Sequence, residues 1–488
     1  MKRTMLLAAS AVAALATASA AQRPGAAAPS PSSRAPAATA QAVASTQRAQ
    51  LERVIARKLL GNGLEVIVIE NHGVPLATVE FDVRNGAFTQ TPEYAGLAHL
   101  YEHMFFKANA TYPEPEAFLA RASELGAVFN GTTREEVVNY YLTLHRDSLE
   151  GGMRFMSAAL RAPLFREDEM VREREVVIGE YDRAESSPFF RLTREMDKRL
   201  YSPGYYSRKN TIGDRNVVRT ATPAMMREIQ RRYYVPNNTA LIVAGDVEPE
   251  RVFALAERIF GDWKKSPDPF VANPIPPVPP LAKSEGVIVE EPVQDVVILM
   301  QWQGPSARQD PGATYAADVF SDVLNNSTST LQRRLVDSGL FQGVAVNYYT
   351  LNNVGPITIS GQTTVDKMRP ALAAMEAEVA KLADPGYYTA AELEPVKRQR
   401  AVGTMLNLER ASGFAHQLGF WWSVTGLDYF MGYVDNMARQ QVSDLQAYAR
   451  KYIVGKPRVV GVLLSPEARR SLGLTEAELV GSAKGVTP

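Results

Sequence analysis

The stretch His99-Leu100-Tyr101-Glu102-His103 is the most informative part of this sequence. It reads H-x-x-E-H and uses two of only five histidines in 488 residues. If the stretch is helical, positions i and i+4 share a face and position i+3 lies beside them. Both imidazoles and one carboxylate would then point into one space, which is the spacing of zinc ligands with a general base beside them. The alternative is an ordinary helix surface or a hydrogen-bonded pair of histidines, so the pattern needs a third ligand.

A candidate third ligand lies downstream, in a stretch that favours a helix. Residues 167–185 are rich in Glu, Arg and Val and contain no proline. Glu173 and Glu180 are seven residues apart, so on a helix they lie on one face, two turns apart. The alternative for this stretch is a solvated, salt-bridged helix, and we accept it for Glu175 and Glu185.

The order of these motifs resembles the pitrilysin and mitochondrial processing peptidase family of zinc peptidases. The chain has 76 residues between His103 and Glu180, which fits the family's active-site block. Weaker matches follow in the same order, and the resemblance covers residues 51–465. These matches are Gly96-Leu97-Ala98 before the motif, Met104 after it, residues 126–133 with Tyr140-Tyr141, and residues 234–238 with 243–246.

The motif and the resemblance together indicate the roles of four residues. His99, His103 and Glu180 would bind one zinc ion per chain and leave one position open for water. Zinc lowers the pKa of such a water to about 7 and polarises the scissile carbonyl. Glu102 faces the same space without ligating, so it would take the proton of the water and pass it to the leaving amine.

Two further residues, Glu173 and Asn130, each have two possible interpretations. Glu173 would be a supporting carboxylate that orients a ligand, or merely part of a solvated helix face. Asn130 would hydrogen-bond the substrate backbone on an edge strand beside the metal, as the resemblance implies, or it would form a turn, because a glycine follows it. We expect the remaining histidines, His72, His145 and His416, to be structural.

One feature of the family is missing. Active single-chain relatives carry an Arg and a Tyr, seven residues apart, in the second half, and these hold the substrate carbonyl. In this chain the matching positions are Leu335 and Gln342, or Arg334 and Phe341 if the alignment is shifted by one. Phe cannot donate a hydrogen bond to a developing oxyanion. We therefore expect a heterodimer in which a homologous subunit supplies the Arg–Tyr pair, with a homodimer as the alternative.

The beginning of the chain predicts export. Residues 1–20 have a short basic start, an apolar stretch and a small-x-small cleavage site, the pattern of a secretory signal peptide, so we expect a periplasmic location. The apolar stretch is too short to span a membrane well, and no other long apolar run exists. Residues 21–50 are mostly Ala, Pro, Ser and Gln and predict a disordered linker.

The rest of the chain is long enough for two domains. Seven prolines between residues 264 and 286 predict an interdomain linker at 266–285, between domains at 51–265 and 286–488. Each half opens with a β-rich run, continues with helix-forming stretches and closes with an apolar strand. This faint echo, together with the resemblance, predicts a duplicated α+β domain, each copy a mainly antiparallel sheet packed with helices, arranged as a clamshell.

Composition narrows the function further. The absence of cysteine excludes a disulfide framework and a cysteine nucleophile. Balanced charges, 53 of each sign, give no sign of nucleic-acid binding. The sequence therefore predicts a zinc endopeptidase acting on peptides or unfolded segments. The alternatives are a non-catalytic or weakly catalytic subunit of a peptidase-like assembly and a peptide-binding module.

Overall fold

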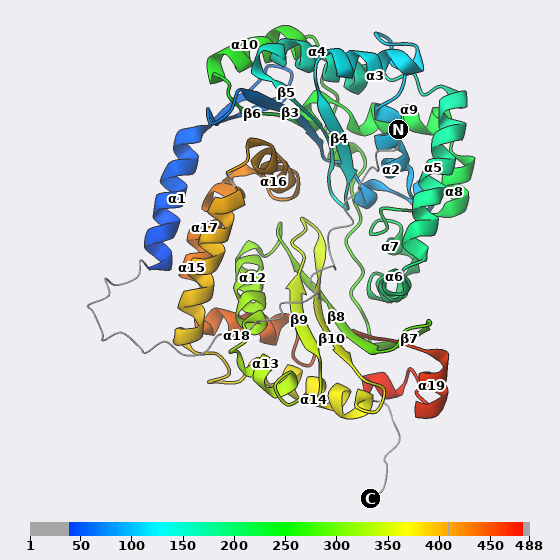
Figure 1. Ribbon diagram of the computed structural model, residues 1–488, viewed down its shortest axis with the longest axis vertical. Helices are drawn as coiled ribbons and strands as arrows, with labels where there is room; N and C mark the ends of the chain where they lie inside the picture. Colours follow the sequence, from blue (N-terminus) through cyan, green and yellow to red (C-terminus); the bar gives the residue numbers. More distant parts are fainter. Residues whose placement is uncertain (1–38, 408, 482–488) are drawn as a thin grey trace, which may run out of the picture. The chain divides into compact units, whose positions relative to one another are not determined.

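The structure is a computed structural model that describes residues 39–407 and 409–481. Its strands form two sheets, each packed with helices (Figure 1). The first sheet has the strand order β1-β2-β6-β3-β5-β4, and the second has the order β7-β11-β8-β10-β9.

The first sheet is mainly antiparallel. Its strands are β1 (Ile55–Leu59), β2 (Glu65–Glu70), β3 (Leu76–Val83), β4 (Val128–Thr133), β5 (Val138–His145) and β6 (Thr239–Gly245). Only β2 and β6 pair in parallel. The central strands β3 and β6 are almost wholly buried, because helices cover both faces of the sheet. By contrast, β4 is an edge strand with several exposed residues.

The second sheet repeats this plan. Its strands are β7 (Glu285–Glu290), β8 (Val296–Ser306), β9 (Gly343–Tyr348), β10 (Val354–Thr363) and β11 (Val459–Leu464). Here β7 and β11 form the parallel pair, and the other neighbours are antiparallel. The order β2-β6-β3-β5-β4 thus recurs as β7-β11-β8-β10-β9. The predicted duplicated α+β fold with mainly antiparallel sheets is confirmed.

On one face of each sheet, helices from the same half pack against the strands and form the core of that half. The first half contributes α2 (Leu97–Phe105), α3 (Pro115–Glu124), α4 (Leu149–Arg161), α5 (Glu167–Glu185), α9 (Pro223–Tyr233) and α10 (Pro249–Phe260). The second half contributes α12 (Pro311–Asn325), α13 (Thr330–Leu335), α14 (Met368–Lys381), α15 (Ala390–Asn407), α17 (Leu427–Arg439) and α18 (Val442–Tyr452). Shorter helices are α7 (Pro203–Tyr206), α8 (Arg215–Thr220), α11 (Pro269–Ala272) and α19 (Pro466–Leu472). The helix predicted at residues 167–185 is confirmed as α5.

The two halves exchange one helix each. The second half's α16 (Ala411–Val424) packs against β3 and β6 on the opposite face of the first sheet. Reciprocally, α6 (Pro188–Leu200) of the first half packs against β7, β8 and β11 of the second sheet. Each sheet therefore buries its second face under a helix from the other half, which no local sequence pattern indicated.

The linker prediction is wrong for residues 40–50, which belong to the helix α1 (Ala40–Val54). Ala44 and Leu51 are fully buried on one face of α1, which contacts α15 and α17. Composition alone suggested disorder because the stretch has few large apolar residues, but small alanines at helical spacing suffice for close packing. The predicted signal peptide and residues 21–38 of the predicted linker lie outside the described residues.

The proline-rich region is consistent with a linker. Between α11 and β7, residues 273–284 form no helix or strand. The domain boundaries themselves stay a prediction. Within the part of the chain that the structure covers, no helix is both long and apolar enough to cross a lipid bilayer.

Candidate metal centre

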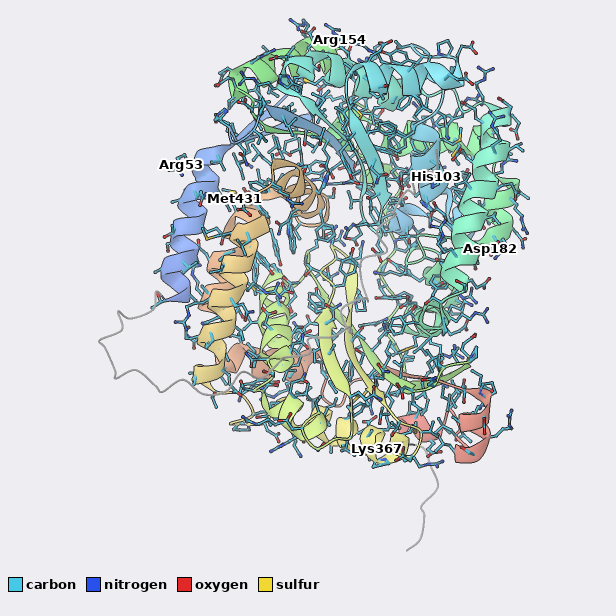
Figure 2. All side chains as sticks on the ribbon, in the orientation of Figure 1. Arg53, His103, Arg154, Asp182, Lys367 and Met431 are labelled. Atoms are coloured by element: carbon cyan, nitrogen blue, oxygen red, sulfur yellow. The ribbon has the colours of Figure 1, made fainter. Side chains whose placement is uncertain are left out.

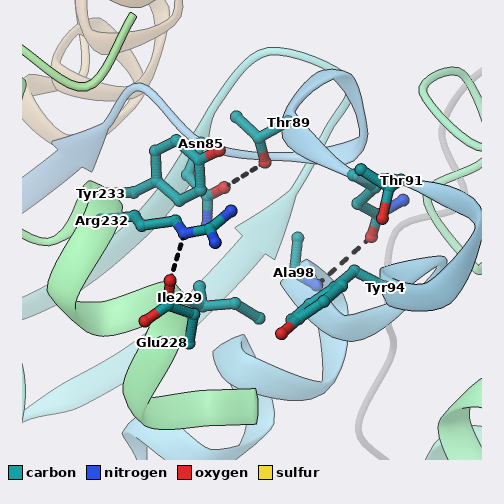
Figure 3. Close-up of a pocket in the computed structure, with 10 residues that line it drawn as sticks. Asn85, Thr89, Thr91, Tyr94, Ala98, Glu228, Ile229, Arg232 and Tyr233 are labelled. Carbon is teal, nitrogen blue, oxygen red and sulfur yellow. Dashed lines mark hydrogen bonds and ion pairs between the residues drawn. The ribbon is translucent and has the colours of Figure 1, made fainter. Parts of the chain in front are cut away.

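The motif residues lie on α2, a short helix whose start is fixed by a buried amide. The Oε1 atom of Gln90 accepts hydrogen bonds from the backbone N–H groups of Gly96 (2.9 Å) and Ala98 (3.3 Å), which are free donors at a helix N-terminus. A small cavity of about 50 Å³ lies beside this end of the helix, with Ala98 and Tyr94 among its lining residues (Figure 3). On its buried side α2 places Leu100, Tyr101 and other apolar residues in the core, so the motif side chains face the other way.

The structure brings His99, His103 and Glu180 together where α5 packs against α2. The Oε2 atom of Glu180 lies 3.4 Å from Nε2 of His99 and 3.7 Å from Nε2 of His103. Figure 2 labels His103 in this region, between β4 and α5 in that view. Among the described residues, this is the group of three His, Cys, Asp or Glu side chains whose ligand atoms all lie within 4.8 Å of one another.

These separations fit a zinc ion. Ligands about 2.0–2.1 Å from a tetrahedral zinc lie about 3.3 Å from one another, close to the distances from Glu180 to the two imidazoles. Two neutral imidazoles and one carboxylate are also a known donor set of catalytic zinc sites, which keep one position open. Each of the three side chains is only 13% exposed, so the site is largely shielded from solvent.

The two imidazoles have opposite electrostatic environments. Burial, together with the neighbouring His103, lowers the pKa of His99 to about 4. Burial also acts to lower the pKa of His103, but its bonds with Glu173 and Glu180 outweigh burial and raise that pKa to about 9. In the metal-free protein at pH 7, His99 is therefore neutral and His103 carries a proton.

Glu173 lies behind His103 and contacts it directly. Its Oε2 atom accepts a hydrogen bond from Nδ1 of His103 at 3.2 Å, on the side of the ring away from Glu180. Its Oε1 atom pairs with Nζ of Lys107 at 2.5 Å. A carboxylate on the outer nitrogen of an imidazole fixes the tautomer and the orientation of the ring. Sequence reasoning missed Lys107, which lies four residues after His103, just beyond the end of α2, and gave no signal of its own.

Glu102 is buried between α2 and the edge strand β4. Its side chain is 6% exposed, and its Oε2 atom accepts a hydrogen bond from the Thr133 hydroxyl at 2.9 Å. A Cβ atom at Gly131 would lie only 2.9 Å from Cγ of Glu102, so glycine lets the strand approach this closely. Burial raises the pKa of Glu102 to about 7, although His103 and Thr133 act to lower it. Such a carboxyl exchanges protons readily near neutral pH.

Asn130 lies inside β4, opposite Tyr141 of β5, so the alternative that it forms a turn is wrong. Its Oδ1 atom accepts a hydrogen bond from the backbone N–H of Gly131 at 2.9 Å. The sequence segment containing Asn130 also contains Thr133, but the contact between Thr133 and Glu102 becomes visible only when β4 is placed beside α2.

The region expected to carry the missing Arg–Tyr pair has a structural role. Both carboxylate oxygens of the buried Glu378 accept hydrogen bonds from Nη1 of Arg334, at 3.1 Å. Leu335 and Phe341 are buried in the core of the second half. Arg334 is therefore occupied by an ion pair between α13 and α14.

The other three histidines do not join the centre. His72 lies 2.7 Å from Asp246, His145 lies 3.4 Å from Asp147, and His416 of α16 contacts Glu80 of β3. Each of these histidines contacts an acidic residue, and none is in the group that could hold a metal.

Comparison with known proteins agrees with this arrangement. The family model described as insulinase, peptidase family M16, matches residues 65–209, and the model of the M16 inactive domain matches residues 220–400. The zinc protease PqqE of Helicobacter pylori is 25% identical over 419 residues, which cover 80% of this chain and 89% of that protein. Human insulin-degrading enzyme is 26% identical over 212 residues, but the chain spans only 20% of its length.

Solved structures show the same fold. A protease from Helicobacter pylori superposes with a TM-score of 0.73 at 21% identity, over 84% of this chain and 99% of that one. The first half of the periplasmic protease PqqL from Escherichia coli gives a TM-score of 0.72 at 19% identity, over 89% of this chain and 98% of that one. From the two family models, the repeated sheets and these relatives, we conclude that the chain belongs to the pitrilysin-like M16 family.

Proposed function

We propose that this protein is a zinc-dependent endopeptidase that hydrolyses peptides or unfolded polypeptide segments. The observation that carries the proposal is the convergence of His99, His103 and Glu180 beside the buried carboxyl of Glu102. Relatives named zinc proteases support the same reading.

His99, His103 and Glu180 would hold the ion, and Glu173 would keep the His103 ring in place through its Nδ1 hydrogen. When bound, zinc would polarise the scissile carbonyl and make a water molecule acidic. Glu102 would accept the proton of the attacking water and deliver it to the amine that leaves. The Thr133 hydroxyl would hold the Glu102 carboxylate in the orientation for this transfer.

The substrate would bind as an added strand on β4. This strand lies at the edge of its sheet, and Glu102 packs against its Gly131. An extended peptide on a free edge forms backbone hydrogen bonds largely independent of its sequence. Asn130, which is exposed on this strand, would contribute a side-chain hydrogen bond to the substrate backbone.

A partner subunit would complete the site. The ion pair between Arg334 and Glu378 leaves the Arg334 side chain committed to the second half's own structure. A homologous subunit lacking the zinc motif would then supply the Arg and Tyr, with a homodimer as the alternative. The same missing pair favours a second candidate function, a weakly catalytic or non-catalytic subunit of a peptidase-like assembly.

The proposed location is the periplasm. The sequence of residues 1–20 has the pattern of a signal peptide, and the similar PqqL of Escherichia coli is described as a periplasmic protease.

The function is tested by separating metal binding from chemistry. The mature protein should contain about one zinc per chain by elemental analysis, and His99→Ala and Glu180→Gln should lower that content sharply. Glu102→Gln should retain zinc but cleave a quenched peptide library at least about a hundredfold more slowly. Each protein should be assayed alone and with a co-expressed homologue. Parental cleavage by Glu102→Gln would refute Glu102 as the base, and full zinc content in both ligand variants would refute the metal site.

A further inference from the structure

The turn between β4 and β5 reaches from the metal centre to the second half. Glu136 lies in this turn and is 3% exposed. Its carboxylate accepts three hydrogen bonds from the loop between β9 and β10. The donors are the backbone N–H groups of Asn352 (2.6 Å) and Asn353 (2.9 Å) and the side-chain amide of Asn353 (2.8 Å).

A partly buried cation also binds the same loop. Nζ of Lys209 donates a hydrogen bond at 2.6 Å to the carbonyl oxygen of Val354, the residue after Asn353. Lys209 also attracts Glu136 electrostatically, and its Nζ lies 4.6 Å from the ring centroid of Tyr201. Three hydrogen-bond donors thus contact Glu136, and the Lys209 cation lies nearby. An ionised carboxylate satisfies all of them, since it has acceptor sites on both oxygens and no donor.

The same turn continues directly into the residue that holds Glu102. Thr133 pairs with Val138 as the last rung between β4 and β5, and the turn is closed by a hydrogen bond from Arg134 N–H to the Val137 carbonyl at 2.9 Å. Only two residues separate Thr133 from Glu136. A displacement of Glu136 would therefore pass along a short, hydrogen-bonded turn to the Thr133 hydroxyl.

We propose that Glu136 is a positioning residue of the catalytic site. By holding the loop of residues 349–353, Glu136 fixes the β4–β5 turn against the second half and so keeps the Thr133 hydroxyl against Glu102. This inference rests on the proposed function, in which Glu102 is the base. Its consequence is that the second half, which has no metal motif, sets the geometry of the base in the first half.

Glu136→Gln is the central variant of the test. A glutamine would turn an NH₂ group toward the converging donors, which disrupts the contact while the size of the side chain is kept. We expect kcat for a quenched peptide to fall about tenfold, with zinc content and KM within about twofold of the parent, because misplacing a catalytic group acts mainly on the transition state. Thr133→Val should give a similar fall, and Thr133→Ser should restore most of the activity.

A double-mutant cycle distinguishes positioning from a general loss of stability. If Glu136 acts through Thr133, adding Glu136→Gln to Thr133→Val should lower kcat by less than about twofold more. Two losses that multiply to about a hundredfold would show independent effects and overturn the proposal.

Two neighbouring asparagines give a matched pair. Asn353→Ala removes one of the three donors and should lower kcat by about threefold. This variant tests the same contact if Glu136→Gln fails to fold. Asn352→Ala keeps the backbone donor and should leave kcat unchanged. Parental kcat in both Glu136→Gln and Asn353→Ala, with an active parent, would overturn the positioning role alone. A parent that binds zinc but cleaves no peptide, either alone or with the co-expressed homologue, would overturn the proposed function and this inference together.

Discussion

Replacing Gly419 with alanine should destabilise the protein, because α16 leaves no room for a side chain between this position and the first sheet. A Cβ atom at Gly419 would lie 2.3 Å from both carboxylate oxygens of Asp82. Asp82 is on the central strand β3 and is fully buried, and neither of its oxygens has a hydrogen-bond partner in the described structure. The carboxylate or the helix would have to move by about 1 Å to restore an ordinary contact.

The expected loss in the free energy of unfolding of Gly419→Ala follows from two opposing effects. Overpacking a buried contact costs about 1–3 kcal/mol. The higher helix propensity of alanine offsets about 1 kcal/mol of that cost. The net loss should be about 1–2 kcal/mol, equivalent to a few degrees in the unfolding temperature of a domain of this size.

Gly403 in α15 supplies the control. It is also a helical glycine, but a Cβ atom there would meet nothing within 4 Å. Gly403→Ala should therefore stabilise the protein by about 0.5–1 kcal/mol. Urea unfolding followed by circular dichroism would compare the two variants, and Asp82→Ala should rescue Gly419→Ala by removing the opposing carboxylate. Equal stability of Gly419→Ala and Gly403→Ala would refute the packing of α16 on β3.

Three further outcomes are expected. Zinc uptake by the metal-free protein at pH 7 should release about one proton, because His103, with a pKa of about 9, must lose its proton whereas His99, with a pKa of about 4, has none to lose. Calorimetry in buffers of different ionisation enthalpy measures the number of protons released. A number near zero would contradict the environment of His103. Glu173→Gln should weaken zinc binding by about 10–100-fold, as measured by competition with a chromogenic chelator. It should also reduce the proton release measured by calorimetry. Unchanged zinc affinity would leave Glu173 without a role at the metal. Burial and the neighbouring Glu80 raise the pKa of Asp82 above its unfolded value, so this carboxyl favours the folded state at low pH and opposes it as the pH rises. Asp82→Asn should therefore stabilise the protein more at pH 8 than at pH 4, as measured by urea unfolding. An equal effect at both pH values would argue against a raised pKa.

The elements that local patterns control were predictable from the sequence. The helix at residues 167–185 and the H-x-x-E-H helix follow from composition and spacing, because residues three, four and seven apart meet on one helix face. The same rule places Glu173 and Glu180 on one face of their helix. The family resemblance singled out Glu180 as the third ligand, and the structure places its Oε2 atom within 3.7 Å of both imidazoles. The repeat of the sheet was visible only as a faint echo of strand sequences.

Contacts between distant segments were not predictable in this way. The packing of α16 on the first sheet and of α6 on the second joins residues about 85–350 positions apart, for which a single sequence gives no signal. The helix α1 was missed for a different reason, because Leu51 is the one large apolar residue on its buried face and the composition of the stretch resembles that of a linker. Thr133 and Glu136 likewise acquire their roles only from neighbours on other elements.

The duplication explains why the chain has one metal motif on two equivalent scaffolds. In the second half, α12 packs against α15 as α2 packs against α5 in the first. Asp318 and Asp322 on α12 have the four-residue spacing of the motif histidines. In this half, however, their charge is balanced by an arginine side chain. The Arg400 guanidinium of α15 bonds Asp322 at 2.7 Å, and it also reaches the hydroxyl of Tyr433, which donates to Asp318 at 2.6 Å. A fixed guanidinium neutralises these carboxylates and fills their hydrogen-bonding sites. The same pair of helices therefore presents converging imidazoles in one half and a closed ion-pair network in the other, which is why a second zinc site is not expected in this chain.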